Sequence, residues 1–245
     1  MQCENQIFLD IIHFLKKHLN EIKSDDVFRF CISLTKRPIS IMQVPEELMK
    51  KMAEVFQKNL IEYDLFQISN ILLLFSEMNV INQSLFTAVE TEIVNNYFEK
   101  IEELKKFPEV SFNFASFLED LSKISFSFAL LINGSLTYWN KFFKCCIFLK
   151  EHISPNTIES LNFVIYRGID YFSRHFSFDN LNKNLLEECY KNLDELSNII
   201  EAKIIKDKLL DQTILDPFSL MMHFARITNN NHLIWNYISM NVKTI

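Results

Sequence analysis

Two adjacent cysteines, Cys145 and Cys146, are the first side chains in this sequence whose types and spacing suggest chemistry. They lie in the segment WNKFFKCCIFLK, with Lys144 just before them and His152 soon after. A nucleophilic or redox-active thiol must ionise to a thiolate, which a nearby base or a helix N-terminus stabilises. The segment is strongly apolar, and cysteine in such a helix packs as a small core residue. We therefore predict that the pair belongs to the core.

The cysteines as a set do not form the pattern of a disulfide framework. There are five, an odd number, without a CxxC spacing, and residues 1–23 do not resemble a secretory signal. A reducing compartment is predicted. Early acidic residues, Glu4 and Asp10, and a first arginine as late as Arg29 also differ from a typical mitochondrial presequence. Import into an organelle would therefore use a removed or atypical signal.

Histidine and carboxylate spacing does not predict a metal or catalytic site. His13 and His18 are five residues apart and fall on different faces of a helix, whereas a metal-binding pair is expected at i and i+4. The adjacent pairs 102–103 and 187–188 are both Glu-Glu, but neighbours on a helix point in different directions. Catalytic carboxyl groups share one cleft. We interpret these histidines and carboxylates as ordinary surface or partly buried groups.

Sequence motifs for phosphate binding and hydrolysis do not occur in the chain. GxGxxG, a Walker loop, GxSxG and HExxH are all missing, and only two glycines, Gly134 and Gly168, are available for a tight turn around phosphate. We therefore predict a protein that is not an enzyme and that uses no cofactor and no metal.

Paired basic residues are the candidates for contact with RNA. Such pairs anchor phosphates if they gather on one surface, and Tyr138 and Trp139 beside Lys141 offer a stacking site for bases. Surface lysines that lay their stems along apolar neighbours explain the same pattern equally well. The candidate RNA-contact residues are Lys16, Lys17, Lys36, Arg37, Lys50, Lys51, Lys105, Lys106, Lys141 and Lys144.

Negative charge is concentrated in the second quarter of the chain. Residues 61–120 contain 3 Lys and Arg against 11 Asp and Glu, in a chain of formal net charge −6. Binding to nucleic acid over the whole surface requires the opposite sign, so any RNA contact is expected to be local. A basic protein partner fits residues 61–120, and a solvated acidic face is the simpler alternative.

Apolar residues recur at spacings of three and four from end to end, which predicts amphipathic helices. One long helix is expected from Asn82 to the residue before Pro108, with Ile93, Tyr97 and Ile101 on its buried side. The scarcity of glycine also disfavours hairpin-rich β structure. We predict an all-α fold.

The helices are expected in pairs, each with a short apolar first helix and a longer second one. First helices are predicted to begin near Asp25, Tyr63, Ser111 and Ser154. Two stretches, 125–128 and 175–178, alternate polar and apolar residues with the period of a strand. Both are short and isolated, and we interpret them as helix ends or connectors.

Residues 63–80, YDLFQISNILLLFSEMNV, are apolar around most of a helix. A membrane-spanning helix needs about 20 largely uncharged apolar residues, and the uninterrupted apolar run here is only Ile71 to Phe75. No membrane span is predicted. A helix that is apolar nearly all round is buried between neighbours. The side chains expected in that core are Leu65, Phe66, Ile68, Ile71, Leu72, Leu74 and Phe75.

The extended pattern YDLFQISNILLLFSEMNVINQSLFTAV resembles degenerate helical-hairpin repeats of the heptatricopeptide and octotricopeptide type. The likeness covers residues 63–101, with a small polar Ser-Asn inside the first helix, a Met-Asn turn and a Leu-Phe opening the second. Such repeats occur in organellar RNA-metabolism proteins and in divergent protist mitochondrial ribosomes. No C-terminal α/β domain of the kind that often follows them is predicted from these residues, and the acidic middle lacks their basic face. No RNA-contact residue of the family is carried over.

The resemblance implies an irregular α-solenoid of helical hairpins with terminal capping helices, forming one domain over residues 1–245 with a sub-boundary near 107–111. The expected function is that of a structural or interaction subunit of a large organellar ribonucleoprotein, such as a mitochondrial ribosome. Its partners would be other proteins of the assembly, and ribosomal RNA through local basic patches. The alternative is a free-standing helical-repeat RNA-binding protein of organellar RNA metabolism. A mitochondrial location is expected, with a cytoplasmic one as the alternative.

Overall fold

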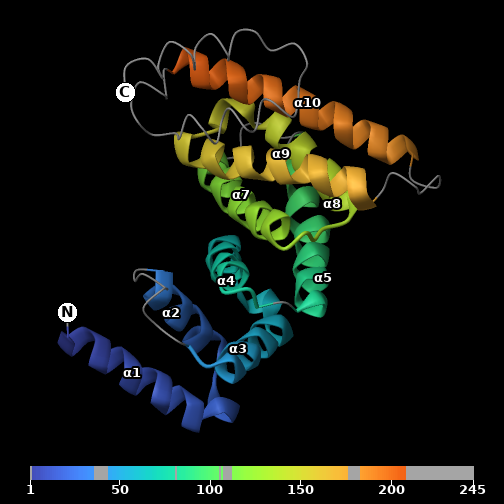
Figure 1. Ribbon diagram of the computed structural model, residues 1–245. Helices are drawn as coiled ribbons and strands as arrows, with labels where there is room; N and C mark the ends of the chain where they lie inside the picture. Colours follow the sequence, from blue (N-terminus) through green and yellow to red (C-terminus); the bar gives the residue numbers. More distant parts are fainter. Residues whose placement is uncertain are drawn as a thin grey trace. The chain divides into compact units, whose positions relative to one another are not determined.

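A computed structural model describes residues 2–35, 44–80, 82–104, 106, 112–175 and 183–207, with the side chains of 2–8 and 168–175 left aside. All regular elements in these ranges are helices, and no strand occurs among them (Figure 1). The all-α prediction is thereby confirmed. Among the helices described, none is long and apolar enough to cross a bilayer.

The chain divides into two compact units, Met1–Glu92 and Ile93–Ile245. The division falls inside one continuous helical run, made of α5 (Gln83–Glu92), a π-helical segment, η4 (Ile93–Phe98), and α6 (Glu99–Leu104). The sub-boundary expected at 107–111 lies outside the described residues, and the expectation of one domain stays a prediction.

The first unit packs its helices in alternation along the chain. It contains α1 (Gln2–Lys17), η1 (Leu19–Glu21), α2 (Ser24–Thr35), α3 (Glu46–Lys58), η3 (Leu60–Glu62), α4 (Leu65–Glu77) and α5. The helix α2 packs mainly on α4, and α3 contacts both α2 and α5. Phe56 of α3 meets Tyr63 and Phe75 edge to face in the core of this unit.

The helix α4 is buried as its composition predicts, with one exception. Leu65, Ile68, Ile71, Leu72, Leu74 and Phe75 are all buried, and so are the small polar residues Ser69 and Ser76. Burial on so many sides is expected for a helix with apolar residues nearly all round. Phe66 is instead 48% exposed, so its assignment to the core was wrong. Its ring lies edge-on to Phe28 of α2 at the edge of the core.

Local sequence signals set both ends of α4. The Asp64 side chain accepts a hydrogen bond from the Gln67 backbone N–H, and the Gln67 side chain accepts one from the Asp64 N–H, which forms a capping box. At the other end Asn79 has a positive φ of 54°. The Val80 N–H bonds to the Phe75 carbonyl at 2.8 Å, as in a Schellman motif.

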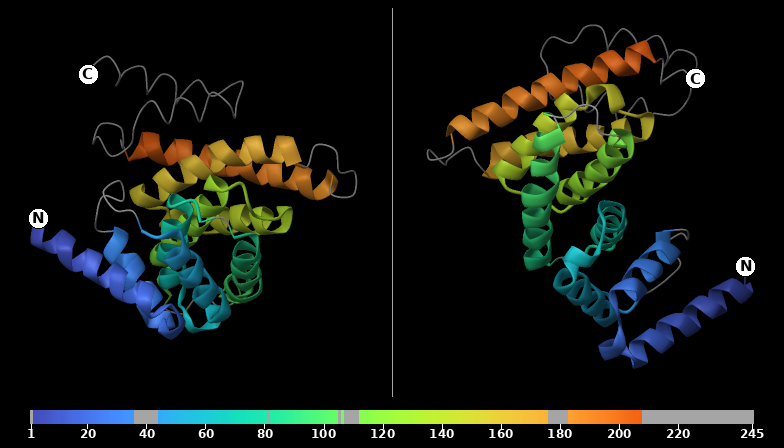
Figure 2. Two further views of the ribbon diagram at one scale, coloured as in Figure 1. Left: turned by 60° about the horizontal axis from the view of Figure 1, so that its bottom comes forward. Right: turned by 180° about the vertical axis from the view of Figure 1, so that it is seen from behind.

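The second unit repeats the alternate packing with longer helices. After η4 and α6 it contains α7 (Phe114–Leu130), α8 (Leu136–Phe148), η5 (Lys150–His152), α9 (Pro155–His175) and α10 (Lys183–Lys206). The most extensive contacts join α7 to α9 and α8 to α10, and α8 also packs on η4. Figure 2 shows α10 running beside α9, which it also contacts.

The four expected first helices are present. They begin at Ser24, Leu65, Phe114 and Pro155, each within three residues of its predicted start. The alternating stretch 125–128 is helical and lies in the last part of α7, as predicted. The second such stretch begins at His175, the last residue of α9, and its other residues lie outside the described ranges.

The π-helical segment changes which residue of the long helix is buried. A π turn holds more residues than an α turn, so the buried side advances by one position along the sequence. Ile93 and Phe98, five residues apart, are both buried, whereas Tyr97 is only partly covered. Tyr97, which α-helical spacing places on the same side as Ile93 and Ile101, is therefore covered less than they are, because that spacing does not hold through the π-helical segment.

Candidate functional site

The candidate RNA-contact residues are scattered over several elements. Lys16 and Lys17 end α1, Lys50 and Lys51 lie on α3, Lys141 and Lys144 lie on α8, and Lys106 follows α6. Lys36, Arg37 and Lys105 lie outside the described residues. In the first unit the described members form two adjacent pairs on two helices. In the second unit Lys141 and Lys144 lie three positions apart on α8, and Lys106 follows α6.

Three of these lysines form ion pairs with carboxylates. Lys50 Nζ lies 2.6 Å from Glu46 Oε1, and Lys51 Nζ lies 3.4 Å from Glu54 Oε2. The hydrogen bond from Lys50 lowers the pKa of Glu46 below its ordinary value, with a further contribution from the charge of Lys50. A phosphate approaching either lysine also meets the paired carboxylate, which reduces the local attraction.

The aromatic stacking site expected beside Lys141 is absent, because both rings are buried. Tyr138 is fully buried and Trp139 is 1% exposed. The Tyr138 hydroxyl lies 2.7 Å from the Ser125 hydroxyl, and the Trp139 indole N–H donates to the Asn133 carbonyl at 3.2 Å. The prediction of a base-stacking surface was therefore wrong. The two rings face the core of the second unit.

A polar contact joins α8 to α10 across the second unit. Asn192 Nδ2 donates to Asn140 Oδ1 at 2.7 Å, and Asn140 Nδ2 donates to Glu188 Oε2 at 2.8 Å. Lys144 Nζ completes the set at 2.7 Å from Glu188 Oε1. Hydrogen bonds from Lys144 and then Asn140 lower the pKa of Glu188. We call these four residues the α8–α10 polar cluster.

Sequence reasoning missed the α8–α10 polar cluster, although a signal was present. Asn140 and Lys144 are spaced at i and i+4 on one helix, and Glu188 and Asn192 have the same spacing on another. Each pair therefore lies on one helical face. Nothing in the sequence says that the two faces meet, because the pairs are separated by a further helix.

The described cysteine thiols are buried. Cys31, Cys145, Cys146 and Cys189 are all at most 3% exposed. Burial raises the pKa of Cys31 and of Cys146, and it raises the pKa of Cys189 to about 12. The prediction that Cys145 and Cys146 pack in the core is confirmed. Such thiols are poor nucleophiles, because the thiolate is the reactive form.

Ligands for a metal ion do not converge in the part of the chain that the structure describes. No group of three His, Cys, Asp or Glu side chains there has suitable geometry. His13 and His152 are exposed, and His18 Nδ1 lies 3.1 Å from Glu21 Oε1.

The first unit contains a hollow of about 870 Å³ beside α3. Met49 and Ala53 of α3 and Met78 and Val80 of the α4–α5 turn give it apolar walls, and Glu54 lies among the polar groups that share its lining. Its size suits a ligand or a short peptide segment. Apolar and polar groups share its lining, and Glu46 and Lys50, which form an ion pair with each other, are among them.

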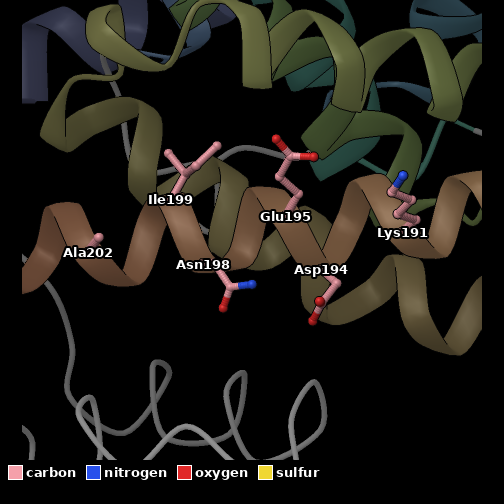
Figure 3. Close-up of a pocket in the computed structure, with 6 residues that line it drawn as sticks. All are labelled: Lys191, Asp194, Glu195, Asn198, Ile199 and Ala202. Carbon is pink, nitrogen blue, oxygen red and sulfur yellow. The ribbon is translucent and has the colours of Figure 1, made fainter.

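A shallow depression follows one helix of the second unit. Its lining consists of six residues of α10 (Figure 3), Lys191, Asp194, Glu195, Asn198, Ile199 and Ala202. Glu195 and Ile199 point to one side of the helix in that view, and Asp194 and Asn198 point to the other. A depression with residues of a single helix around it offers a surface for contact and no enclosed reaction site.

Comparisons with protein-family models, with curated proteins and with solved structures find no match to this chain. The chemistry of its own residues consists of buried thiols, paired lysines, buried aromatic rings and exposed carboxylates such as Glu99, Glu102 and Glu103.

Proposed function

We propose that this chain is a non-enzymatic structural subunit of a large organellar ribonucleoprotein, such as a mitochondrial ribosome, and that its helices form an irregular α-solenoid of hairpins. In this role the protein holds neighbours together through its helix surfaces. Most of its contacts would be made to other proteins, and RNA would be touched only at local basic residues.

The observation that carries the proposal is the alternate packing of the helices. Within each unit a first helix packs mainly on the next first helix, as α2 on α4 and α7 on α9. Second helices also contact each other: α8 contacts α10 extensively, and α3 contacts α5 to the same extent as it contacts α2. Stacked helical hairpins have this pattern, in which each hairpin contacts its neighbours and both ends expose helix surfaces. Such arrays commonly serve as extended binding surfaces.

The pairing and exposure of the charged residues favour contacts with proteins and disfavour a broad interface with RNA. Lys50, Lys51 and Lys144 are paired with carboxylates, and the aromatic rings of α8 are buried. The carboxylates of α6, in contrast, are exposed and suit a basic protein neighbour. A free-standing RNA-binding repeat protein needs a strongly basic face, and the described lysines support this alternative less well.

The test is recovery of the tagged endogenous protein from cells, with its partners identified by mass spectrometry. The lysate is divided into samples with and without ribonuclease, and each is fractionated by size at low and at high salt. Recovery in a megadalton particle together with ribosomal or other ribonucleoprotein subunits supports the proposal. Recovery as a free protein, or with RNA alone in a ribonuclease-sensitive form, overturns it and favours the free-standing RNA-binding alternative.

A further inference from the structure

The helix α1 carries a second apolar side that the first unit leaves uncovered. Its packed side contains Ile12, which is 6% exposed, with Leu15 and Leu19 partly buried. On another side Ile11 and Phe14 are 44% and 60% exposed, and His18 stacks on Phe14 with the ring centroids 4.5 Å apart. Figures 1 and 2 show α1 at the edge of the first unit.

The exposed Ile11 and Phe14, together with the partly buried His18, have the spacing of a helix-pairing seam. Ile11, Phe14 and His18 follow one another at intervals of three and four, which is the a/d spacing of a two-helix coiled coil. A helix of 16 residues is about 24 Å long, which is enough for a short pairing of this kind. We call Ile11, Phe14 and His18 the α1 seam.

Opposite charges lie along one flank of the α1 seam. Asp10 immediately precedes Ile11, and Lys17 immediately precedes His18, so the two exposed residues are one heptad apart on the same flank. In an antiparallel pair of identical helices, this flank of one helix faces the same flank of the other. Ile11 then meets Phe14 of the second copy, and Asp10 of each copy approaches Lys17 of the other.

We propose that the α1 seam pairs two copies of this chain in an antiparallel, twofold-symmetric dimer. The surface is self-complementary, as an isologous interface requires, because one rotation satisfies both apolar contacts and both ion pairs. A parallel pair would place the flank of Asp10 and Lys17 against the uncharged Leu15 flank and lose both pairs. This inference is independent of the proposed assembly, and it predicts self-association in the purified protein.

The contact is small and depends partly on charge. An interface of one helix pair falls in the class of weak associations, so its detection requires a concentration series. Sedimentation of the purified full chain is expected to show a mean mass that rises with concentration from 29.1 kDa toward twice that value. Added salt is expected to weaken the association, because both ion pairs are exposed.

Two glutamate variants test the apolar part of the seam. Phe14→Glu is expected to leave the protein monomeric at every concentration, because it places a charge at the centre of the pairing. Leu9→Glu is the matched control, since Leu9 is 51% exposed on the same helix but lies off the seam. Circular dichroism of both variants checks that the helices are retained. Equal effects of the two variants, or a wild-type protein that stays monomeric throughout, would overturn the proposal.

Charge reversal tests the antiparallel arrangement itself. Asp10→Lys and Lys17→Glu each turn two attractive pairs into two repulsive ones, and each is expected to weaken dimerisation about tenfold. The double variant restores opposite charges and is expected to recover the wild-type constant. A mixture of the two single variants is expected to form a heterodimer more tightly than either variant pairs with itself. A mixture no tighter than the separate variants rules the arrangement out.

Discussion

Asn192 of α10 donates a hydrogen bond of 2.7 Å to Asn140 of α8, and both side chains are buried at the interface of these helices. A buried amide pair fixes which residues of two helices lie opposite each other, because any shift along the axis leaves polar atoms without partners. The pair therefore selects one register among several that an apolar interface of the same size would allow.

Replacement of both amides is expected to cost less than the sum of the two single replacements. Asn192→Leu leaves the Asn140 oxygen buried without this donor, and it should lower the free energy of unfolding by about 1–3 kcal/mol. The double variant with Asn140→Leu should lose less than the sum of the two single changes, because no amide is left stranded. Urea denaturation of the four proteins measures the coupling. The exposed Asn198 on the same helix gives the control, as Asn198→Leu should change stability little; strictly additive losses would contradict the role of the pair.

Gly134 is required by the turn between α7 and α8. It has a positive φ of 98°, and a Cβ at this position would lie 2.8 Å from Nε1 of Trp139. Gly134→Ala is therefore expected to lower the free energy of unfolding by about 2 kcal/mol, through backbone strain and displacement of the indole. Thermal denaturation measures the loss, and tryptophan emission should shift as the contact between the indole N–H and the Asn133 carbonyl is disturbed. Unchanged stability and emission would show that the turn tolerates a side chain.

Ile132 offers a change in the opposite direction. This β-branched residue has a positive φ of 56° at the end of α7 and is 46% exposed, so it combines an unfavourable backbone conformation with little packing. The equivalent position after α4 is Asn79, a residue type that accepts this conformation better. Ile132→Asn should raise the free energy of unfolding by about 1 kcal/mol, and Asn79→Ile should lower it. Chemical denaturation measures both, and the same sign for the two variants would contradict the argument.

The buried cysteines should be inert in the folded protein. Burial raises the pKa of Cys31, Cys146 and Cys189, which keeps these three thiols protonated at pH 8, and burial blocks access to all four cysteines. In a Cys3→Ser background, iodoacetamide is expected to label Cys31, Cys145, Cys146 and Cys189 only after urea is added, as peptide mass spectrometry would show. Rapid labelling of Cys145 or Cys146 in the native protein would instead indicate an activated thiol and reopen the question of catalysis.

The sequence predicted helix positions better than it predicted burial. Helix starts depend on local signals, such as Asp64 with Gln67 at α4, and these act within a few residues. Burial depends on which other helix covers a given face. Phe66 and Trp139 were therefore misassigned, and Tyr97 is covered less than its spacing predicts, since each lies at a position where a distant partner or a π turn decides which side faces inward.

The α8–α10 polar cluster could not be predicted for a related reason. Its two halves, at Asn140 and Asn192, are 52 residues apart. Each half alone has the composition of an ordinary solvated helix face. Only the packing of α8 on α10 turns both faces inward, and helix spacing does not encode that packing.

Tyr63 makes stability sensitive to alkaline pH. Its ring is 6% exposed, its hydroxyl donates to the Ser24 carbonyl at 2.9 Å, and burial raises its pKa to about 12. The folded state thus holds the phenol proton more tightly than the unfolded chain, whose tyrosine titrates near its ordinary value of 10. The stabilisation is complete below that value and is lost as pH rises toward the folded pKa.

Tyr63→Phe removes both the hydrogen bond and the titrating group. Near pH 8 the variant should be less stable than the wild type by about 1 kcal/mol. The difference between their urea midpoints should shrink as pH rises above 10. In the wild type the Tyr63 phenol loses its proton more readily when the chain unfolds, and the variant has no phenol at this position. Other groups that lose protons on unfolding are common to both proteins, so their contributions cancel in the difference. If the difference between the two urea midpoints stays constant from pH 8 to about pH 11, the pKa of Tyr63 is the same in the folded and the unfolded state.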